Sequence, residues 1–433
     1  MSHQPSRREF LIGGTAILAG AALPSFSFAQ GRRGDRLRFA IVGVGGRGSA
    51  NLASAGKHGD VVALCDVDVA TRAKALVEYP DASTFEDYRK MLDSMRGQID
   101  AVVISTPDHT HFPAAAMAMD FGKHVYCEKP LTRAIGESRK LQEIARRKRV
   151  VTQMGNQGTA GTELRKAAAL IKSGAFGTVK EVHCYTNRSG GWWPQGVERP
   201  APARTPRTVD WNLWIGTAPM RPYAPGYHPF AWRGWWDFGS GALGDIGCHC
   251  MNLPFMALDL RDPIAVSAKT SGHNRDSFPS WSVVTYEFPK RGNREAVNLY
   301  WYDGGKKPEQ ALAPGVDYGG NGCLIVCEKA TLFMPGEYGQ GARIVGGGEM
   351  PPVAVEESPG HFTEFANAIL GQGKAKSSIP EYSGPLTETV LLGNLAVWAD
   401  GPRVEWDSRR MRVPGHPEYD VLIHPQYRPG FGV

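Results

Sequence analysis

One stretch near the start of the chain constrains the fold more than any other. An apolar run, residues 37–42, is followed by glycines in the pattern G-x-G-x-x-G at Gly43, Gly45 and Gly48. A helix-compatible stretch then continues through residue 55. A strand, this glycine turn and a helix form the fingerprint of a dinucleotide-binding unit. We therefore expect the turn, including Gly46 and Arg47, to hold a pyrophosphate at the helix N-terminus.

A second strand supports this interpretation. Residues 61–65 are apolar and end at Asp66, which lies 18 residues after Gly48. A carboxylate here accepts hydrogen bonds from both ribose hydroxyls and repels a 2′-phosphate, so the pattern favours NAD over NADP. Two alternatives stay open. Arg72 is near enough in sequence to accommodate a 2′-phosphate, and Asp66 could instead cap the next helix.

Short apolar runs and helical stretches alternate up to residue 155, which predicts a doubly wound parallel sheet, a Rossmann domain. A chain of 433 residues has room for two or three domains. We assign residues 34–155 to the dinucleotide-binding domain and 156–433 to a domain for substrate and oligomerisation. The expected strands are 101–105, 124–127 and 150–154, and the expected helices are 112–121 and 134–147.

Three later motifs resemble the Gfo/Idh/MocA oxidoreductase family, over roughly residues 36–400. The motifs are STPDHTH at 105–111, GKHVYCEKPL at 122–131 and GALGDIGCH at 241–249. This resemblance implies an α/β fold: an N-terminal Rossmann domain, then a C-terminal α/β domain with a large open, mainly antiparallel sheet. It also implies NAD(P)-dependent dehydrogenase chemistry on sugars, cyclitols or related polyols.

The resemblance assigns roles to single residues. It places Lys129 beside the nicotinamide, where its ammonium would hydrogen-bond the reacting oxygen, and Glu128 at a cofactor ribose. Thr106, His111 and Asn156 match positions that line the cofactor. The family usually has an arginine after the last strand, whereas this chain has Asn-Gln-Gly at 156–158, so substrate contacts in this loop are not assigned.

The third motif holds two more candidate catalytic side chains. Asp245 and His249 are four residues apart in a helix-compatible segment, so both would face one side of a helix. Oxidising a secondary alcohol requires a base for the hydroxyl proton, and histidine is the natural general base near neutral pH. We expect His249 to be this base and Asp245 to orient its ring.

Aromatic residues point to the substrate. Seven of the 11 tryptophans lie between residues 192 and 236, in loops rich in proline and glycine. Aromatic faces on loops suit the apolar faces of pyranose rings. A sugar or glycoside is therefore the expected ligand, and the alternative for Trp211 and Trp214 is packing in the domain core. The residues assigned to the substrate are Trp193, Tyr227, Arg233 and Trp236.

The N-terminus predicts export. Residues 1–29 contain paired arginines followed by Phe-Leu, a mildly apolar stretch and small residues around a cleavage position, which resembles a twin-arginine signal peptide. Residues 386–393 and 427–431 resemble an exported bacterial subgroup of the family. Proteins on this route are exported folded, so we expect periplasmic localisation and a cofactor that is tightly held and regenerated in place.

Other classes of protein are disfavoured. The net charge of +6 is spread along the chain, which argues against nucleic acid as a partner. No apolar run reaches the ~20 residues that span a bilayer. The seven cysteines are expected to be buried thiols, and Cys-His-Cys at 248–250 lacks further ligands, so no metal is predicted. By resemblance, the open sheet is expected to pair with another copy, as a homodimer or homotetramer.

Together these patterns predict an oxidoreductase that oxidises or reduces a secondary hydroxyl of a sugar or glycoside, with NAD as cofactor. The alternative is a redox-assisted glycoside hydrolase or lyase, in which transient oxidation drives elimination. The combination of Glu-Lys-Pro with D-x-x-x-H favours the dehydrogenase.

Overall fold

The first sheet of the computed structural model has the order that a doubly wound domain requires. Its six strands are parallel and lie in the order β3-β2-β1-β4-β5-β6. The structure describes residues 36–188 and 190–432, so the predicted signal peptide at 1–29 lies outside the described residues. The strands are β1 (Leu37–Val42), β2 (Gly59–Cys65), β3 (Ser83–Phe85), β4 (Ala101–Ile104), β5 (His124–Cys127) and β6 (Thr152–Met154).

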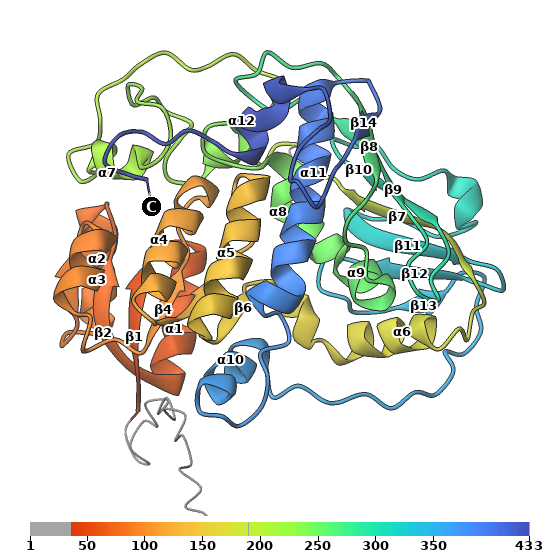
Figure 1. Ribbon diagram of the computed structural model, residues 1–433, viewed down its shortest axis with the longest axis horizontal. Helices are drawn as coiled ribbons and strands as arrows, with labels where there is room; N and C mark the ends of the chain where they lie inside the picture. The colour runs from red at the N-terminus through yellow and green to blue at the C-terminus, as the bar shows by residue number, and fades with distance from the viewer. Residues whose placement is uncertain (1–35, 189, 433) are drawn as a thin grey trace, which may run out of the picture. The chain divides into compact units, whose positions relative to one another are not determined.

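Helices cover both faces of this sheet, as Figure 1 shows for the left half of the view. Aspartates cap two of them: Asp68 accepts from the amide of Ala70, and Asp87 accepts from the amide of Arg89. Glu137 accepts from the Ala134 amide at the start of another helix. The helices are α1 (Arg47–His58), α2 (Val69–Glu78), α3 (Tyr88–Ser94), α4 (Asp108–Asp120) and α5 (Ile135–Lys148).

The second sheet is mixed but mainly antiparallel. Its eight strands lie in the order β13-β12-β11-β7-β10-β9-β8-β14, and β10 pairs with β7 in parallel. The open, mainly antiparallel sheet that the resemblance implied is therefore confirmed. The strands are β7 (Val179–Thr186), β8 (Ala265–Thr270), β9 (Ser282–Phe288), β10 (Val297–Tyr302), β11 (Asn321–Cys327), β12 (Thr331–Pro335), β13 (Arg343–Ile344) and β14 (Val404–Glu405).

The remaining helices follow the first sheet in the chain. Asp210 caps α7 by accepting from the amide of Leu213. The helices are α6 (Thr162–Lys172), α7 (Trp211–Ile215), α8 (Gly241–Cys250), α9 (Asn252–Leu258), α10 (His361–Ile369), α11 (Gly384–Ala399) and α12 (Asp420–Ile423). Short 3₁₀ and π turns are at Gln157–Ala160, Ala231–Gly234, Gln310–Leu312, Pro417–Tyr419 and Ile379–Ser383.

Helix α11 joins the two sheets. It is apolar around most of its circumference, and nearly all of its residues are buried, as expected for a helix with neighbours on every side. It packs on α5 of the first half and on α8, β8 and β9 of the second. A side chain at Gly393 would collide with the hydroxyl of Tyr286, so glycine allows the helix to approach β9 closely.

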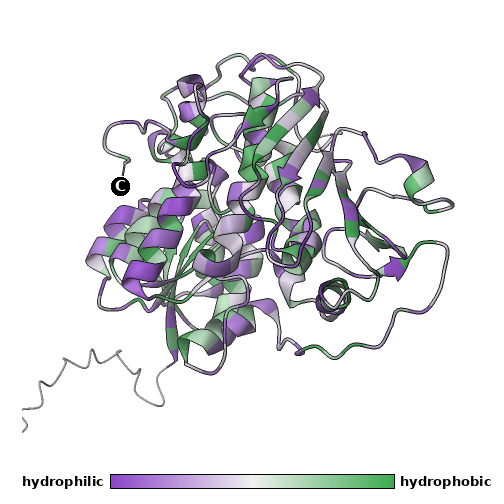
Figure 2. Cartoon of the chain, turned by 45° about the vertical axis from the view of Figure 1, so that its right-hand side comes forward, coloured by the Kyte–Doolittle hydropathy of each residue, from purple (hydrophilic) through white to green (hydrophobic). Residues whose placement is uncertain are grey.

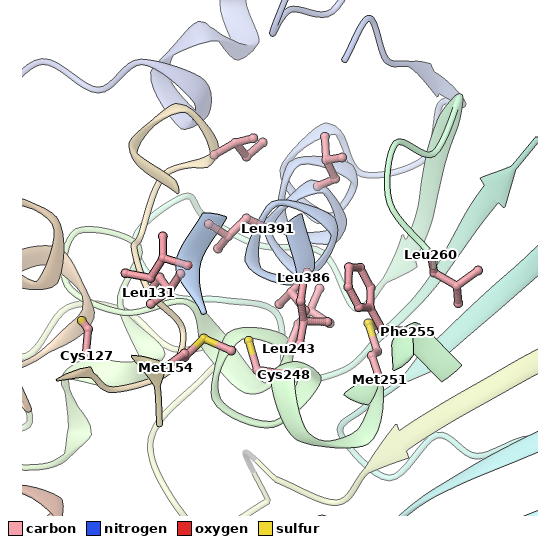
Figure 3. Packing of buried hydrophobic residues seen from close by; sticks show 14 of the residues in the cluster. Cys127, Leu131, Met154, Leu243, Cys248, Met251, Phe255, Leu260, Leu386 and Leu391 are labelled. Atoms are coloured by element: carbon pink, nitrogen blue, oxygen red, sulfur yellow. The ribbon is translucent and has the colours of Figure 1, made fainter. Parts of the chain in front are cut away.

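The core at this junction positions the third sequence motif. Figure 3 shows Cys127 and Met154, from the ends of β5 and β6, in one cluster with Leu243 and Cys248 of α8 and with Leu386 of α11. Strands of the first sheet are largely hydrophobic, while their covering helices alternate polar and apolar stripes (Figure 2). The helix that holds Asp245 and His249 is therefore packed against the strand ends that hold Glu128 and Lys129.

Several element boundaries differ from the sequence prediction by one to four residues. Helix α4 begins at Asp108, four residues before the expected start, and β6 begins at Thr152 instead of 150. Pro113 lies inside α4, where its missing amide leaves the His109 carbonyl oxygen without its usual helix donor. That oxygen accepts a hydrogen bond from the Thr217 hydroxyl instead. In the described residues, no helix is both long and apolar enough to cross a membrane.

Candidate active site

The glycine turn has the geometry that a bound pyrophosphate requires. Gly43 has φ +82°, and a Cβ there would lie 2.7 Å from the carbonyl oxygen of Ser105. A Cβ at Gly48 would lie 2.1 Å from the carbonyl oxygen of Gly43. Helix α1 starts without a capping side chain and has no acidic residue in its first turn. Its N-terminus therefore suits an anionic ligand, and no other atom lies within 4 Å of a Cβ built at Gly46.

Asp66 lies directly after β2 and is tied to this turn. Its carboxylate accepts hydrogen bonds from the amides of Val44 (3.0 Å) and Asp68 (2.9 Å), and burial raises its pKa. The cap of α2 is Asp68 and not Asp66. The Arg72 guanidinium donates to the backbone carbonyls of Asp66 and Phe85. Arg72 is therefore engaged by the backbone and does not serve as the cation that a 2′-phosphate of NADP would need.

A buried carboxylate lies beneath the turn. Glu128 accepts hydrogen bonds from Asn51 (2.8 Å) and Arg47 (3.1 Å), both of α1. A Cβ at Gly155 would lie 2.4 Å from the Glu128 carboxylate, so the chain passes very close to it. Glu128 thus fixes the first turn of α1, and the predicted contact of Glu128 with a ribose stays a prediction.

The Lys129 ammonium is anchored on Asp245. Its Nζ donates to the Asp245 carbonyl oxygen at 2.6 Å and to Asp245 Oδ1 at 2.8 Å. Arg233 Nε donates to the same Oδ1 at 3.1 Å. These two cations hold the pKa of Asp245 well below its usual range, against the opposite effect of burial. Lys129 follows the end of β5, Arg233 lies in the tryptophan-rich loops and Asp245 lies on α8. The fold brings these three side chains together.

His249 lies one helical turn after Asp245 on α8 and is buried. Burial, and next the charge of Lys129, lower the pKa of its imidazole well below the usual value. Its Nδ1 is buried without a hydrogen-bond partner, and its ring meets Tyr338 edge to face at 5.1 Å. No hydrogen bond joins Asp245 to this ring in the part of the chain that the structure describes. Asp245 therefore orients Lys129, and not His249 as expected.

Sequence reasoning missed Asp108 as a site residue. It is the first residue of α4 and is buried; burial raises its pKa to about 7, although the charges of Lys129 and Arg233 act in the opposite direction. Asp108 was part of the first motif, but nothing in the sequence showed that its carboxyl is withdrawn from water beside two cations.

The three remaining cofactor candidates lie around the end of the first sheet, and His111 and Asn156 are buried. The His111 ring nitrogens face the carbonyl oxygens of Pro130 and Thr106, each at 2.8 Å. This ring thus holds the loop that carries Lys129 against the start of α4. The Asn156 Oδ1 accepts from Ser377, while its Nδ2 is buried without a partner. Thr106 is half-buried at the end of β4.

Two family models match the chain and together cover more than half of it. Residues 37–156 match "Oxidoreductase family, NAD-binding Rossmann fold" and residues 160–296 match "Oxidoreductase family, C-terminal alpha/beta domain". The chain belongs to the Gfo/Idh/MocA oxidoreductase family. The prediction of an NAD-binding Rossmann domain, made from the glycine turn, is thereby confirmed.

Individual relatives are distant. Levoglucosan dehydrogenase of Pseudarthrobacter phenanthrenivorans is 26% identical over 194 residues, which cover 45% of this chain and 40% of the relative. The chain spans about a third to a half of the length of the first curated relatives that it matches.

Solved structures show the same fold over most of the chain. The WlbA dehydrogenase of Bordetella pertussis, in complex with NADH and UDP-GlcNAcA, has a TM-score of 0.60 at 18% identity, covering 86% of this chain and 99% of that one. An inositol dehydrogenase homologue of Azotobacter vinelandii, with NADH and myo-inositol, has a TM-score of 0.58 at 18% identity, covering 86% and 98%.

The aromatic residues assigned to the substrate are not open platforms. Tyr227 and Trp236 are buried: Tyr227 packs between Trp211, Trp235 and Phe238, and Trp236 stacks on Phe278 at 3.7 Å. Trp193 is also buried and donates from Nε1 to Gln195. Tyr227 belongs to a buried cluster within the tryptophan-rich loops, and Trp236 belongs to the main hydrophobic core. Arg233, by contrast, contacts Asp245, the residue that also holds Lys129.

A cavity of about 400 Å³ lies elsewhere, beside α6 and α9, and includes none of these site residues. Its lining mixes cations, carboxylates and apolar side chains: Arg165, Lys172, Phe255, Met256, Asp259, Arg261, Glu356, Lys376 and Tyr382.

Proposed function

We propose that this chain is an NAD(P)-dependent oxidoreductase, with NAD favoured, that oxidises or reduces a secondary hydroxyl of a sugar or glycoside. One observation supports this above the others: an ammonium, Lys129, is fixed on the Asp245 carboxylate on the helix face that also presents His249 with an unpartnered Nδ1. This cluster lies at the end of β5, on the edge where parallel strands of such sheets bind ligands.

The residues present fit a dinucleotide. The open N-terminus of α1 would hold the pyrophosphate, and Asp66 would receive the adenosine ribose hydroxyls through lone pairs that Val44 and Asp68 leave free. When bound, NAD would supply a nicotinamide that accepts a hydride from the carbon of the reacting hydroxyl.

The side chains of the cluster would handle the oxygen and its proton. Lys129 donates a hydrogen bond to the substrate oxygen, which favours the negative charge that develops as the O–H bond breaks. His249 would take the hydroxyl proton at its unpartnered Nδ1. Its lowered pKa keeps the ring neutral before the reaction and favours release of that proton afterwards. Asp245 and Arg233 hold the ammonium in place throughout.

The test is a turnover assay with purified protein, NAD and a panel of sugars, polyols and glycosides. The expected result is a rise in NADH absorbance together with formation of an oxidised product. Both should be almost abolished in the Lys129→Met variant. A glycoside that is cleaved to free sugar with no net NADH would instead establish the redox-assisted hydrolase or lyase.

We also propose that the protein is exported by the twin-arginine route and works in the periplasm as a homodimer or homotetramer with retained cofactor. The arginine pair at 7–8 and the tail motif support export, and the family resemblance supports self-association. Cell fractionation of the wild type and an Arg7→Lys/Arg8→Lys variant tests the first point. Light scattering of the purified protein tests the second.

A further inference from the structure

Three large aromatic side chains remain exposed in the described part of the chain, and all three surround the candidate active site. Trp192, Phe230 and Tyr338 are 48%, 44% and 45% exposed. The other large hydrophobic residues that are exposed there are aliphatic or methionine, and they are scattered over other elements. Exposed apolar surface that gathers at one place marks a ligand or partner site.

Two of the three rings are linked to Asp245 or His249 through side-chain contacts. The Arg233 guanidinium lies 4.5 Å from the Phe230 ring centroid, and Arg233 also bonds Asp245. The Tyr338 ring meets His249 at 5.1 Å.

Trp192 is placed by a second arginine. The Arg188 guanidinium lies 3.5 Å from its ring centroid and pairs with Glu337 at 3.4 Å. Glu337 directly precedes Tyr338, and its carboxylate also accepts a hydrogen bond from Asn321 of β11. The segment after β12 is therefore fixed to β11. Arg188 thereby connects two of the exposed rings, from loops that are far apart in sequence.

The rings differ in their distance from the reacting group. Tyr338 contacts His249 directly, so it is near enough to touch the reacting sugar. Phe230 is linked to Lys129 only through two intervening side chains, Arg233 and Asp245, and Trp192 is held by Arg188. Tyr338 is therefore the ring assigned to the reacting sugar, and Phe230 and Trp192 are assigned to the rest of the substrate.

We infer that Trp192 and Phe230 form a stacking platform for a second sugar ring, so that the substrate is a glycoside or oligosaccharide and not a free monosaccharide. This inference rests on the proposed function and names its substrate class. Aromatic faces pack against the C–H faces of a pyranose, while Arg188 and Arg233 beside them can donate to its hydroxyls.

The test compares binding and turnover of matched pairs of sugars by the NAD-loaded protein. Calorimetric titration with cellobiose, maltose, lactose and their component monosaccharides measures affinity without requiring turnover. We expect at least one disaccharide to bind tenfold or more tightly than its components. Trp192→Ala and Phe230→Ala should each reduce that advantage about five- to tenfold, and Trp192→Phe should restore most of it.

Val77→Ala is the matched control, because Val77 is an exposed apolar residue on α2 and makes no contact with the site. It should leave the affinity ratio unchanged. Equal affinities for disaccharides and monosaccharides would overturn the inference, and so would a lack of disaccharide binding. It would also be overturned if Trp192→Ala reduced the affinity for disaccharides and for monosaccharides by the same factor. Disaccharide-selective binding without NADH formation would keep the platform and refute the proposed dehydrogenase.

Discussion

Lys129 is the residue on which the proposed chemistry depends most. Its ammonium is held by two oxygens of Asp245, and Arg233 shares the same carboxylate. Such an arrangement fixes the position of a hydrogen-bond donor before substrate binds, which is how positioned groups lower a barrier.

Replacing Lys129 by methionine should therefore reduce turnover and leave the cofactor site intact. We expect kcat to fall about 10²- to 10⁴-fold, the range for a positioned proton-transfer group, with little change in NAD affinity. Steady-state kinetics and calorimetric NAD titration measure the two effects. Lys140→Ala, at an exposed lysine of α5, is the control. Full activity of Lys129→Met would refute the role.

Asp108 predicts how stability depends on pH. Its folded pKa of about 7 is raised above that of the unfolded chain, so between about pH 4 and pH 7 the folded state keeps a proton that the unfolded state has released. The contribution of Asp108 to the free energy of unfolding is therefore full at low pH and is lost as pH rises through about 7. Asp108→Asn, which cannot ionise, should remove this loss.

Urea unfolding of both proteins at about pH 5 and about pH 8 checks this prediction. The variant should lose less stability between the two pH values than the wild type, by ~1 kcal/mol or more. Identical pH dependence in the two proteins would show that Asp108 is ionised in the folded state.

Neighbouring residues show what the sequence could predict and what it could not. The glycines were predicted from their spacing after a strand, Asp245 from its four-residue spacing to His249, and Lys129 from the resemblance of its motif to the family. The exposed aromatics were not, because Trp192 and Trp193 are adjacent and equally hydrophobic, and only packing decides that Trp193 is buried and Trp192 is half exposed. Asp108 was missed for the same reason, since burial changes its pKa and no motif reports burial.

At the scale of elements, the strand and helix pattern was predictable wherever local rules and tertiary packing agree. The parallel strands are short apolar runs, and α5 was predicted within one residue at each end. The start of α4 was predicted four residues late. The preceding residues His109 and His111 belong to the helix, and both rings are buried against backbone carbonyls, which no local pattern reports.

The glycine turn gives an element-scale prediction. Gly48→Ala would place a Cβ 2.1 Å from the Gly43 carbonyl oxygen, so α1 must shift away from β1. We expect NAD affinity to fall more than tenfold and the free energy of unfolding to fall by about 1–3 kcal/mol. Gly97→Ala is the control, since a Cβ there meets nothing within 4 Å. Wild-type NAD affinity in Gly48→Ala, measured by calorimetry, would contradict the close packing.

At the scale of the whole molecule, buried polar contacts hold the last third of the chain on the two sheets. Arg165 of α6 pairs with Glu364 of α10 at 2.5 Å, and both side chains are buried. Ser358 donates to the same carboxylate, and Arg165 also donates to the Thr159 carbonyl. This network fixes α10, which packs on α1 of the dinucleotide-binding domain.

Removing one partner of this pair should be costly. Arg165→Met leaves Glu364 buried without its cation, which we expect to reduce the free energy of unfolding by about 3–5 kcal/mol. The double variant Arg165→Met/Glu364→Leu should recover much of that loss, because no unpaired charge remains. Arg36→Ala, which breaks an exposed pair with Asp60, should cost less than about 1 kcal/mol. Equal losses of unfolding free energy in Arg165→Met and Arg36→Ala would contradict the account.

The central claim is that one dinucleotide connects the glycine turn to the cluster of Lys129, Asp245 and His249. A crystal structure of the protein with bound NAD tests it most directly. The account predicts the pyrophosphate at the N-terminus of α1 and the nicotinamide beside the Lys129 ammonium. A nicotinamide directed away from these three side chains, or a dinucleotide bound at another place, would contradict it.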